Sequence, residues 1–294
     1  MAGGLEGVAV VKRLLVPPAL GLVIAVLVVA TLIQVSNDLR FEFLVGALAL
    51  LAGGLLLGSL GCTGWWAWLS LCLPLGVVAG YAIWEAKGSY FRAAWPQWIL
   101  WGLAGLVGLR WGQAGRRRRA ALGTAILAAV SIGYAAWFLP AALSRTLNRV
   151  RDEPAPELGL ASLDGRPLPA SSWRGKVVVL DFFQTWCGPC LAELPQIERA
   201  RAELARRGDI EFYLVASEQG DDTPEALRSF LERRRLRLRA AFDRGGKAHD
   251  ALGFVGVPAL AVLDRSGKIR LTRVGYNAAE VDFHTYLVRF LSGL

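Results

Sequence analysis

The sequence predicts an α-helical membrane bundle of five spans, followed by a soluble α/β domain with a mixed central sheet. Two observations support this division. Long apolar runs fill the first 140 residues, which hold only ten Lys or Arg and four Asp or Glu, whereas the remainder holds 23 and 20. In that remainder, β-branched strand patterns alternate with helical patterns, which is typical of α/β domains.

Five apolar segments are long enough to be membrane helices. Residues 14–35 contain no charged side chain, and at about 1.5 Å per residue they can cross a hydrocarbon core of about 30 Å. This first segment exceeds the roughly 7–15 apolar residues of a signal peptide, so we expect a retained helix. The five expected spans are residues 14–35, 41–60, 63–84, 95–111 and 120–140.

The basic residues of the short loops predict the orientation of the bundle. Arg110 and the run Arg116 to Arg119 lie between the fourth and fifth spans, and Lys and Arg favour the cytoplasmic side in short loops. Lys12 and Arg13 then fall on the same side. We therefore expect a multi-pass protein of the cell (inner) membrane, in contact with lipid, whose C-terminal domain is extracytoplasmic or periplasmic.

The net charge of +9 does not describe one basic surface. It divides into +6 before residue 140 and +3 after it, so we expect no nucleic-acid partner. The run Arg233 to Arg239 follows an expected helix, and we interpret it as a solvated helix end that is stabilised by the helix dipole. A contact with membrane or with an acidic client is the alternative for this run.

The second half begins with an expected linker, residues 141–156, because Pro154 and Pro156 disfavour helix. An α/β domain is expected over residues 157–294. Its expected elements follow the usual strand, cap and turn signals. They are a buried strand 176–183, a helix from the Gly188–Pro189 pair, a strand 210–217, a helix capped by Thr223 before Pro224, a short strand 240–242, a hairpin 259–275 that turns at Ser266–Gly267, and a final helix to Leu294.

The segment "FFQTWCGPC", residues 182–190, carries the chemistry. Cys187 lies where the strand ends and the helix starts, so backbone N–H groups and the helix dipole would stabilise its thiolate and make it the nucleophile. Cys190, one turn later, is placed to resolve a mixed disulfide. A structural zinc site would need four ligands, and His249 and His284 are far apart in sequence. We therefore expect a redox-active disulfide, with no metal and no cofactor; a static structural disulfide is the alternative.

The run "VVVLDFFQTWCGPCLAELP" and the downstream "FVGVPALAVLDRSGKI" resemble the membrane-anchored TlpA/ResA group of thioredoxin-like thiol-disulfide oxidoreductases, over about residues 157–294. The resemblance implies a thioredoxin-like fold and a cis peptide bond at Pro258, which lies against the dithiol. It also implies that the backbone of Val257 pairs with the substrate, and we add Trp186 as a substrate contact. Apocytochromes c or copper-site proteins are the clients that the resemblance suggests, which points to cytochrome c biogenesis.

Two acidic residues are candidates for the proton relay. Asp181 interrupts an apolar strand, where a buried carboxyl has a raised pKa and can accept the proton of Cys190. Glu193, three residues after Cys190, is the alternative relay, and its simpler interpretation is a first-turn glutamate that the helix dipole favours.

The sequence therefore predicts a membrane-anchored thiol-disulfide oxidoreductase that reduces disulfides of extracytoplasmic proteins. Its electron donor is unidentified and could be a membrane protein. A thiol peroxidase is one alternative, although Leu180 and Gln184 stand where such enzymes carry Pro and Thr. A non-enzymatic membrane receptor or assembly factor is another. Cys62 and Cys72 suggest an electron relay, but two cysteines ten residues apart on one helix are separated by about 15 Å and cannot bridge each other.

Overall fold

A computed structural model of the chain describes residues 14–28, 38–62, 64–85, 91–113, 117–218, 222–280 and 282–294. The chain forms two compact units, Met1–Thr146 and Leu147–Leu294, and each is described by itself. Lys12, Arg13 and Arg116, which support the expected orientation, lie outside the described residues, as does the end of the first expected span.

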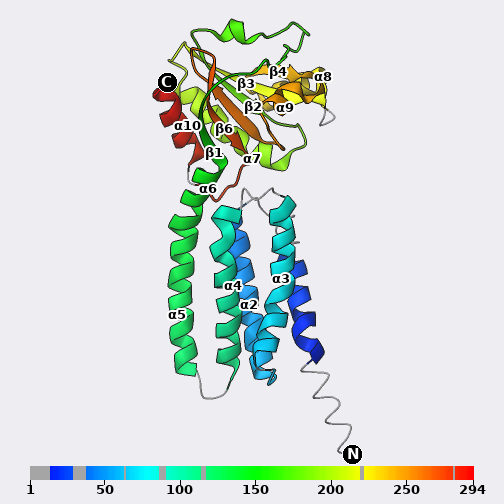
Figure 1. Cartoon of the computed structure of the whole chain (residues 1–294), viewed down its shortest axis with the longest axis vertical. Helices are drawn as coiled ribbons and strands as arrows, with labels where there is room; N and C mark the ends of the chain where they lie inside the picture. The colour runs from blue at the N-terminus through cyan, green and yellow to red at the C-terminus, as the bar shows by residue number, and fades with distance from the viewer. Residues whose placement is uncertain are drawn as a thin grey trace, which may run out of the picture. The chain divides into compact units, whose positions relative to one another are not determined.

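The N-terminal unit consists of helices (Figure 1). After an apolar helix Leu14–Val28, they are α2 (Leu39–Ser59), α3 (Trp65–Glu85), α4 (Phe91–Gly112), α5 (Arg117–Gly133), the π-helical turn Tyr134–Phe138 and α6 (Leu139–Leu147). Two continuous helices, Leu39–Ser59 and Ala121–Leu147, are long and apolar enough to cross a membrane. They overlap the expected spans 41–60 and 120–140, and a bundle of five spans stays a prediction.

Glycines allow α2 and α4 to pack with their backbones close together. A Cβ atom on Gly54 of α2 would lie 2.3 Å from the carbonyl oxygen of Gly105, and one on Gly108 of α4 would lie 2.1 Å from the carbonyl oxygen of Leu51. Small residues at such positions permit close helix packing in membrane proteins. No larger side chain fits at these two positions unless the helices separate.

The C-terminal unit is built on a six-stranded mixed sheet in the order β1-β6-β5-β2-β3-β4. The strands are β1 (Asn148–Pro154), β2 (Val177–Phe182), β3 (Ile210–Ser217), β4 (Arg239–Asp243), β5 (Ala259–Leu263) and β6 (Lys268–Val274). β2, β3 and β4 are parallel, and β5, β6 and β1 join antiparallel. The expected mixed sheet is confirmed.

Helices cover both faces of this sheet. On one face, the core includes side chains of α7 (Gly188–Glu203), α8 (Pro224–Arg234) and α10 (Phe283–Ser292). On the other face, the core includes α9 (Lys247–Ala251), Trp173 of the 3-10 turn Ala170–Trp173 and the segment before it. β2 is buried along its whole length, as a strand covered on both faces must be.

Several local signals act as expected. The side chain of Thr223 caps α8 by accepting a hydrogen bond from the backbone of Ala226 at 3.1 Å. The hairpin of β5 and β6 turns at Ser266 and Gly267, where Gly267 has a φ of +83°, a conformation that glycine adopts without strain. Arg233 and Arg234 lie in the last turn of α8.

The prediction that residues 141–156 form a linker is wrong. Its first part continues the helix to Leu147, and its second part is β1, which pairs antiparallel with β6. An edge strand tolerates a proline at its end, because one side of such a strand makes no ladder hydrogen bonds. The pairing with β6 satisfies the backbone of a segment whose charges and prolines indicated irregular structure.

Candidate functional site

The dithiol lies where the sequence predicts, at the junction between β2 and α7. Cys187 is the N-cap of α7, and Cys187 and Cys190 form a disulfide bond with their Cα atoms 5.2 Å apart. The Sγ atom of Cys187 accepts a hydrogen bond from the backbone N–H of Cys190 at 3.2 Å. Pro189 fits in the first turn because proline has no backbone N–H and the N–H groups of the first turn have no intrahelical partner.

Little of the dithiol is open to solvent. Cys187 is 5% exposed and Cys190 is 3% exposed, whereas the neighbouring Trp186 is 67% exposed. Cys187 is at the start of the helix, so the same backbone N–H and the helix dipole would stabilise its thiolate after reduction. The geometry therefore favours Cys187 as the attacking sulfur.

The loop before the dithiol is held by a residue that sequence reasoning missed. The buried carboxylate of Asp222 accepts a hydrogen bond from the backbone N–H of Thr185 at 2.8 Å and another from the Thr185 hydroxyl. Asp222 lies directly before Thr223, the N-cap of α8, so the start of α8 is tied to the loop two residues before Cys187. The signal in the sequence was an acidic residue directly before the Thr223–Pro224 start of a helix.

The expected cis peptide bond is confirmed between Val257 and Pro258. Val257 packs against the core cluster that includes Cys187 and Cys190, and the carbonyl of Pro258 accepts a hydrogen bond from the backbone of Gly275 at 2.7 Å. The start of β5 is thereby joined to the end of β6 near the dithiol.

Asp181 is buried in the sheet, on the face that α7 and α10 cover. In the strand register, Asp181 of β2 is opposite Leu260 of β5, which is opposite Arg273 of β6, so all three lie in one row across the sheet. Burial raises the pKa of Asp181 to about 7, and the positive charge of Arg273 limits the rise. A carboxyl group with a pKa near neutrality can either give or take a proton.

Glu193 is also buried, on the inward face of α7. Its Oε1 atom lies 3.3 Å from Nε of Arg273, and burial raises its pKa well above the ordinary value although Arg273 opposes the rise. The interpretation of Glu193 as a first-turn glutamate that the helix dipole favours is wrong, since it lies in the second turn and faces the core.

Arg273 acts electrostatically on both relay candidates, and sequence reasoning missed it. Its side chain is 1% exposed and forms a two-point ion pair with Glu280, one bond of which measures 2.9 Å. It also donates a hydrogen bond to Asn148 at 3.2 Å, and its guanidinium carbon lies 4.0 Å from the ring centre of Phe283. The sequence signal was the alternation of inward-facing and outward-facing residues along β6. This alternation places Arg273 on the same face of the sheet as the core residue Leu271.

Comparisons with known proteins match this unit. A family model described as Redoxin matches residues 151–287. Thiol-disulfide oxidoreductase ResA of Bacillus thuringiensis subsp. konkukian is 28% identical over 115 residues, which are 39% of this chain and 64% of ResA. Thioredoxin-like protein YneN of Bacillus subtilis is 27% identical over 151 residues, 51% of this chain and 87% of YneN.

The C-terminal unit is thus similar to thioredoxin-like proteins of the ResA type. One similar solved structure is that of a secreted disulfide oxidoreductase of Mycobacterium tuberculosis, which is homologous to DsbE of E. coli. It is 23% identical to this chain, with a TM-score of 0.38. The match covers 46% of this chain and 93% of that chain. The ResA match covers a little less than two thirds of ResA.

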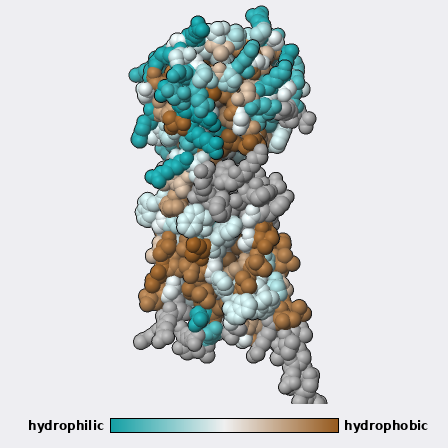
Figure 2. All heavy atoms as spheres, in the orientation of Figure 1, coloured by the Kyte–Doolittle hydropathy of each residue, from teal (hydrophilic) through white to brown (hydrophobic). Residues whose placement is uncertain are grey.

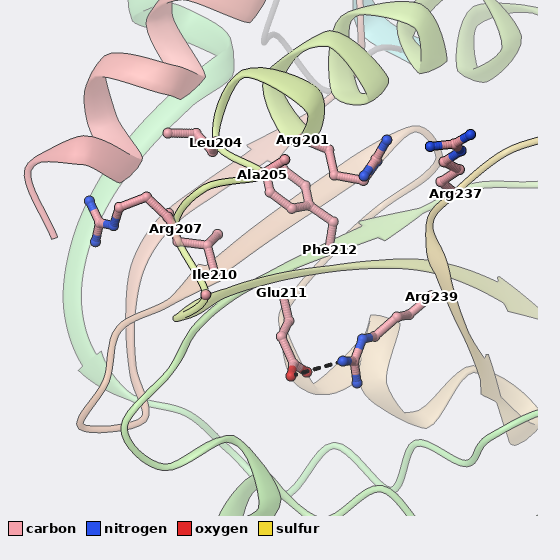
Figure 3. Close-up of a pocket in the computed structure, with 10 residues that line it drawn as sticks. Arg201, Leu204, Ala205, Arg207, Ile210, Glu211, Phe212, Arg237 and Arg239 are labelled. Carbon is pink, nitrogen blue, oxygen red and sulfur yellow. Dashed lines mark ion pairs between the residues drawn. The ribbon is translucent and has the colours of Figure 1, made fainter.

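The C-terminal unit has a cavity away from the dithiol. A cavity of about 260 Å³ is lined by side chains that include Arg201, Arg237, Arg239 and Glu211 (Figure 3). It lies at the start of β3, and therefore at the opposite end of the parallel strands from Cys187. Arg239, the last residue of the arginine run, forms an ion pair with Glu211 at 3.3 Å, so this part of the run has a structural role that the solvated interpretation did not include.

Cys62 and Cys72 lie outside this domain. Cys62 follows α2 in the turn before α3, whereas Cys72 lies on α3, and both remain thiols. The assumption that both lie on one helix is wrong, because Cys62 lies between α2 and α3 whereas Cys72 lies within α3.

Proposed function

We propose that the chain is a membrane-attached thiol-disulfide oxidoreductase that reduces disulfide bonds of proteins outside the cytoplasm. The observation that carries the proposal is the Cys187–Cys190 pair at the N-terminus of α7, with two buried carboxyl groups on the same face of the sheet. The description of ResA as a thiol-disulfide oxidoreductase supports it.

In the proposed reaction, the Cys187 thiolate attacks a disulfide of the client protein. One client sulfur leaves as a thiolate and takes up a proton, and a mixed disulfide joins Cys187 to the other. Cys190 then gives up its proton and attacks Sγ of Cys187, which releases the second client sulfur. The client gains two electrons and two protons, and the protein returns to the disulfide state.

Asp181 and Glu193 are the proposed acceptors of the Cys190 proton. Glu193 lies three residues after Cys190 on α7, a spacing that puts two residues on one face of a helix with Cβ atoms about 5–6 Å apart. Asp181 has a pKa of about 7, close to the value at which a general base works best at neutral pH.

Trp186, Val257 and Pro258 are the proposed contacts for the client. Trp186 is the large exposed side chain next to Cys187, and large aromatic side chains dominate many protein contacts. The half-buried Val257 offers its backbone at the start of β5, where an extended client segment would pair.

The N-terminal unit is the proposed membrane anchor. Its helices expose many large apolar side chains, among them Leu48, Val77 and Ile126, and Figure 2 shows hydrophobic side chains gathered over this unit. Soluble proteins rarely expose so much apolar surface. We propose a multi-pass anchor in lipid with the dithiol on the extracytoplasmic side, reduced by a dithiol protein that is itself a candidate membrane protein.

A trapping experiment tests this function. In the Cys190→Ser variant the mixed disulfide cannot be resolved, so intact cells should accumulate covalent complexes with clients, and the Cys187→Ser variant is the matched control that should trap none. Identification of apocytochromes c or copper-site proteins in the complexes would name the client class. Equal complexes with both variants would refute the proposed role of Cys187.

The orientation is tested in the same cells. A membrane-impermeant thiol reagent should label Cys187 of the reduced Cys190→Ser variant before lysis. Labelling that requires lysis would refute an extracytoplasmic dithiol. Peroxide consumption that depends on Cys187 would instead favour the thiol peroxidase.

A further inference from the structure

The cluster around Arg273 contains more negative than positive groups. Asp181, Glu193 and Glu280 all act electrostatically on one another or on Arg273, and all four side chains are buried. Three carboxylates and one guanidinium would carry a net charge of −2. A buried site disfavours such a charge strongly, so the cluster keeps protons that isolated carboxyl groups would lose.

The geometry indicates which carboxyl group is the main partner of Arg273. Glu280 forms the two-point ion pair with Arg273 and accepts a further hydrogen bond from the side chain of Asn148 at 3.3 Å. Such charge-assisted bonds favour the ionised form. Glu193 makes one contact with Arg273, at 3.3 Å between Oε1 and Nε, and Asp181 is linked to Arg273 through its charge across the sheet row. The retained proton therefore belongs to Asp181 and Glu193.

We propose that Arg273 is a positioning residue for thiol-disulfide exchange: it pairs at two points with Glu280 and leaves a proton on the pair Asp181 and Glu193, of which Glu193 is one helical turn from Cys190. Asn148 of β1 completes the arrangement by contacting Arg273 and Glu280 together. The inference rests on the proposed function and assigns to Arg273, Glu280 and Asn148 a role in the proton transfer of that reaction.

Other titratable groups that face the cluster stay neutral near pH 7. Tyr276 follows β6 and Tyr286 belongs to α10, and burial raises the pKa of both hydroxyls. The cysteine pair at the start of α7 supplies the reacting atoms themselves. The charge near the dithiol is thus set by the three carboxyl groups and Arg273.

Two variants, each of which removes one charge, are predicted to shift the pH dependence of the exchange rate in opposite directions. Arg273→Gln removes the positive charge, so Asp181 and Glu193 should hold their proton to higher pH, and the acid limb of the rate against pH should move up by about one pH unit or more. Glu280→Gln removes a negative charge and frees Arg273 for the other two carboxyl groups, so the limb should move down by a similar amount. On the acid limb, one pH unit corresponds to about a tenfold change in rate.

The measurement is the rate at which the reduced full-length protein in detergent reduces a small disulfide reagent between pH 5 and 9. Arg273→Lys keeps the charge and should restore a limb near the original position. The double variant Arg273→Gln/Glu280→Gln removes one charge of each sign and should also lie near it. If Arg273→Gln does not fold, Glu280→Gln and the double variant still differ in the predicted direction.

The matched control is Arg270→Gln on the same strand, whose arginine pairs with Asp152 and Asp264 and should leave the limb in place. The role of Arg273 would be overturned if Glu280→Gln left the acid limb of the pH–rate profile in place. It would also be overturned if Arg273→Gln and Glu280→Gln shifted that limb in the same direction. Absence of exchange by the unaltered protein at every pH would overturn the proposed function instead.

Discussion

Replacement of Asp181 by Asn should remove a dependence of stability on pH. Burial raises the pKa of Asp181 from its ordinary 3.8 to about 7. In the unfolded chain this group is ionised above about pH 4, whereas in the folded protein it keeps its proton up to about pH 7. The folded state therefore binds one more proton across that range, and stability must fall as the pH rises.

The size of the effect follows from the pKa difference. Each pKa unit corresponds to about 1.4 kcal/mol, so ionisation of the buried carboxyl costs the folded protein roughly 4 kcal/mol once the pH exceeds 7. Between pH 5 and pH 8 the portion lost is roughly 3 kcal/mol. Asn cannot ionise, so the stability of Asp181→Asn relative to the unaltered protein should increase by that amount over the same interval.

Thermal unfolding of the full-length protein in detergent measures this increase. For a domain of this size, roughly 3 kcal/mol corresponds to about 6–10 °C in Tm, so the difference in Tm between variant and unaltered protein should grow by that much from pH 5 to pH 8. The control is Asp264→Asn. Burial opposes ionisation of Asp264, but hydrogen bonds from Ser266 and Lys268 hold its pKa below the ordinary value, so its Tm difference should stay constant. A Tm difference for Asp181→Asn that is flat or shrinks with pH would refute the reasoning.

Three further predictions concern other contacts. Asp222→Ala removes both hydrogen bonds to Thr185 and should slow disulfide exchange by about tenfold, whereas Thr185→Val, which keeps the backbone bond, should have a smaller effect in the same rate assay. Gly108→Ala places a Cβ atom 2.1 Å from a carbonyl oxygen of α2. The two helices must then separate, so the Tm in detergent should fall by several degrees. The control Gly76→Ala, with no atom within 4 Å of its new Cβ, should leave the Tm unchanged. Gly267→Ala must adopt a φ of +83° and should cost about 1 kcal/mol in denaturant unfolding; an unchanged midpoint would contradict the need for glycine at the hairpin turn.

The elements that sequence reasoning predicted well are those with strong local signals. The continuous apolar run of β2, the Thr223–Pro224 start of α8 and the Ser266–Gly267 turn each specify structure from a few neighbouring residues. Asp181 was predicted to be buried because a charge inside an apolar strand is costly, and the structure buries it. The dithiol position follows from the same strand and the Gly188–Pro189 helix start.

The elements that escaped prediction depend on distant pairing. β1 has prolines and charges and becomes a strand only because β6 offers it an edge, more than a hundred residues later in the chain. The partners of Arg273 come from β1, α7 and the segment before α10, and no local pattern brings Asn148, Glu193 and Glu280 together. Long-range contacts of this kind leave no periodic signal in a single sequence.

The position of Asn148 has a practical consequence for anyone who cuts the chain. The motifs that resemble the TlpA/ResA group begin near residue 157, and a soluble fragment started there would keep the dithiol, the cis peptide bond and both relay carboxyl groups. It would lose β1, so β6 would become an uncovered edge that invites association between copies. It would also lose the amide that joins Arg273 to Glu280. A fragment meant to report the chemistry of the whole protein should therefore start before Asn148, within the helix that ends at Leu147.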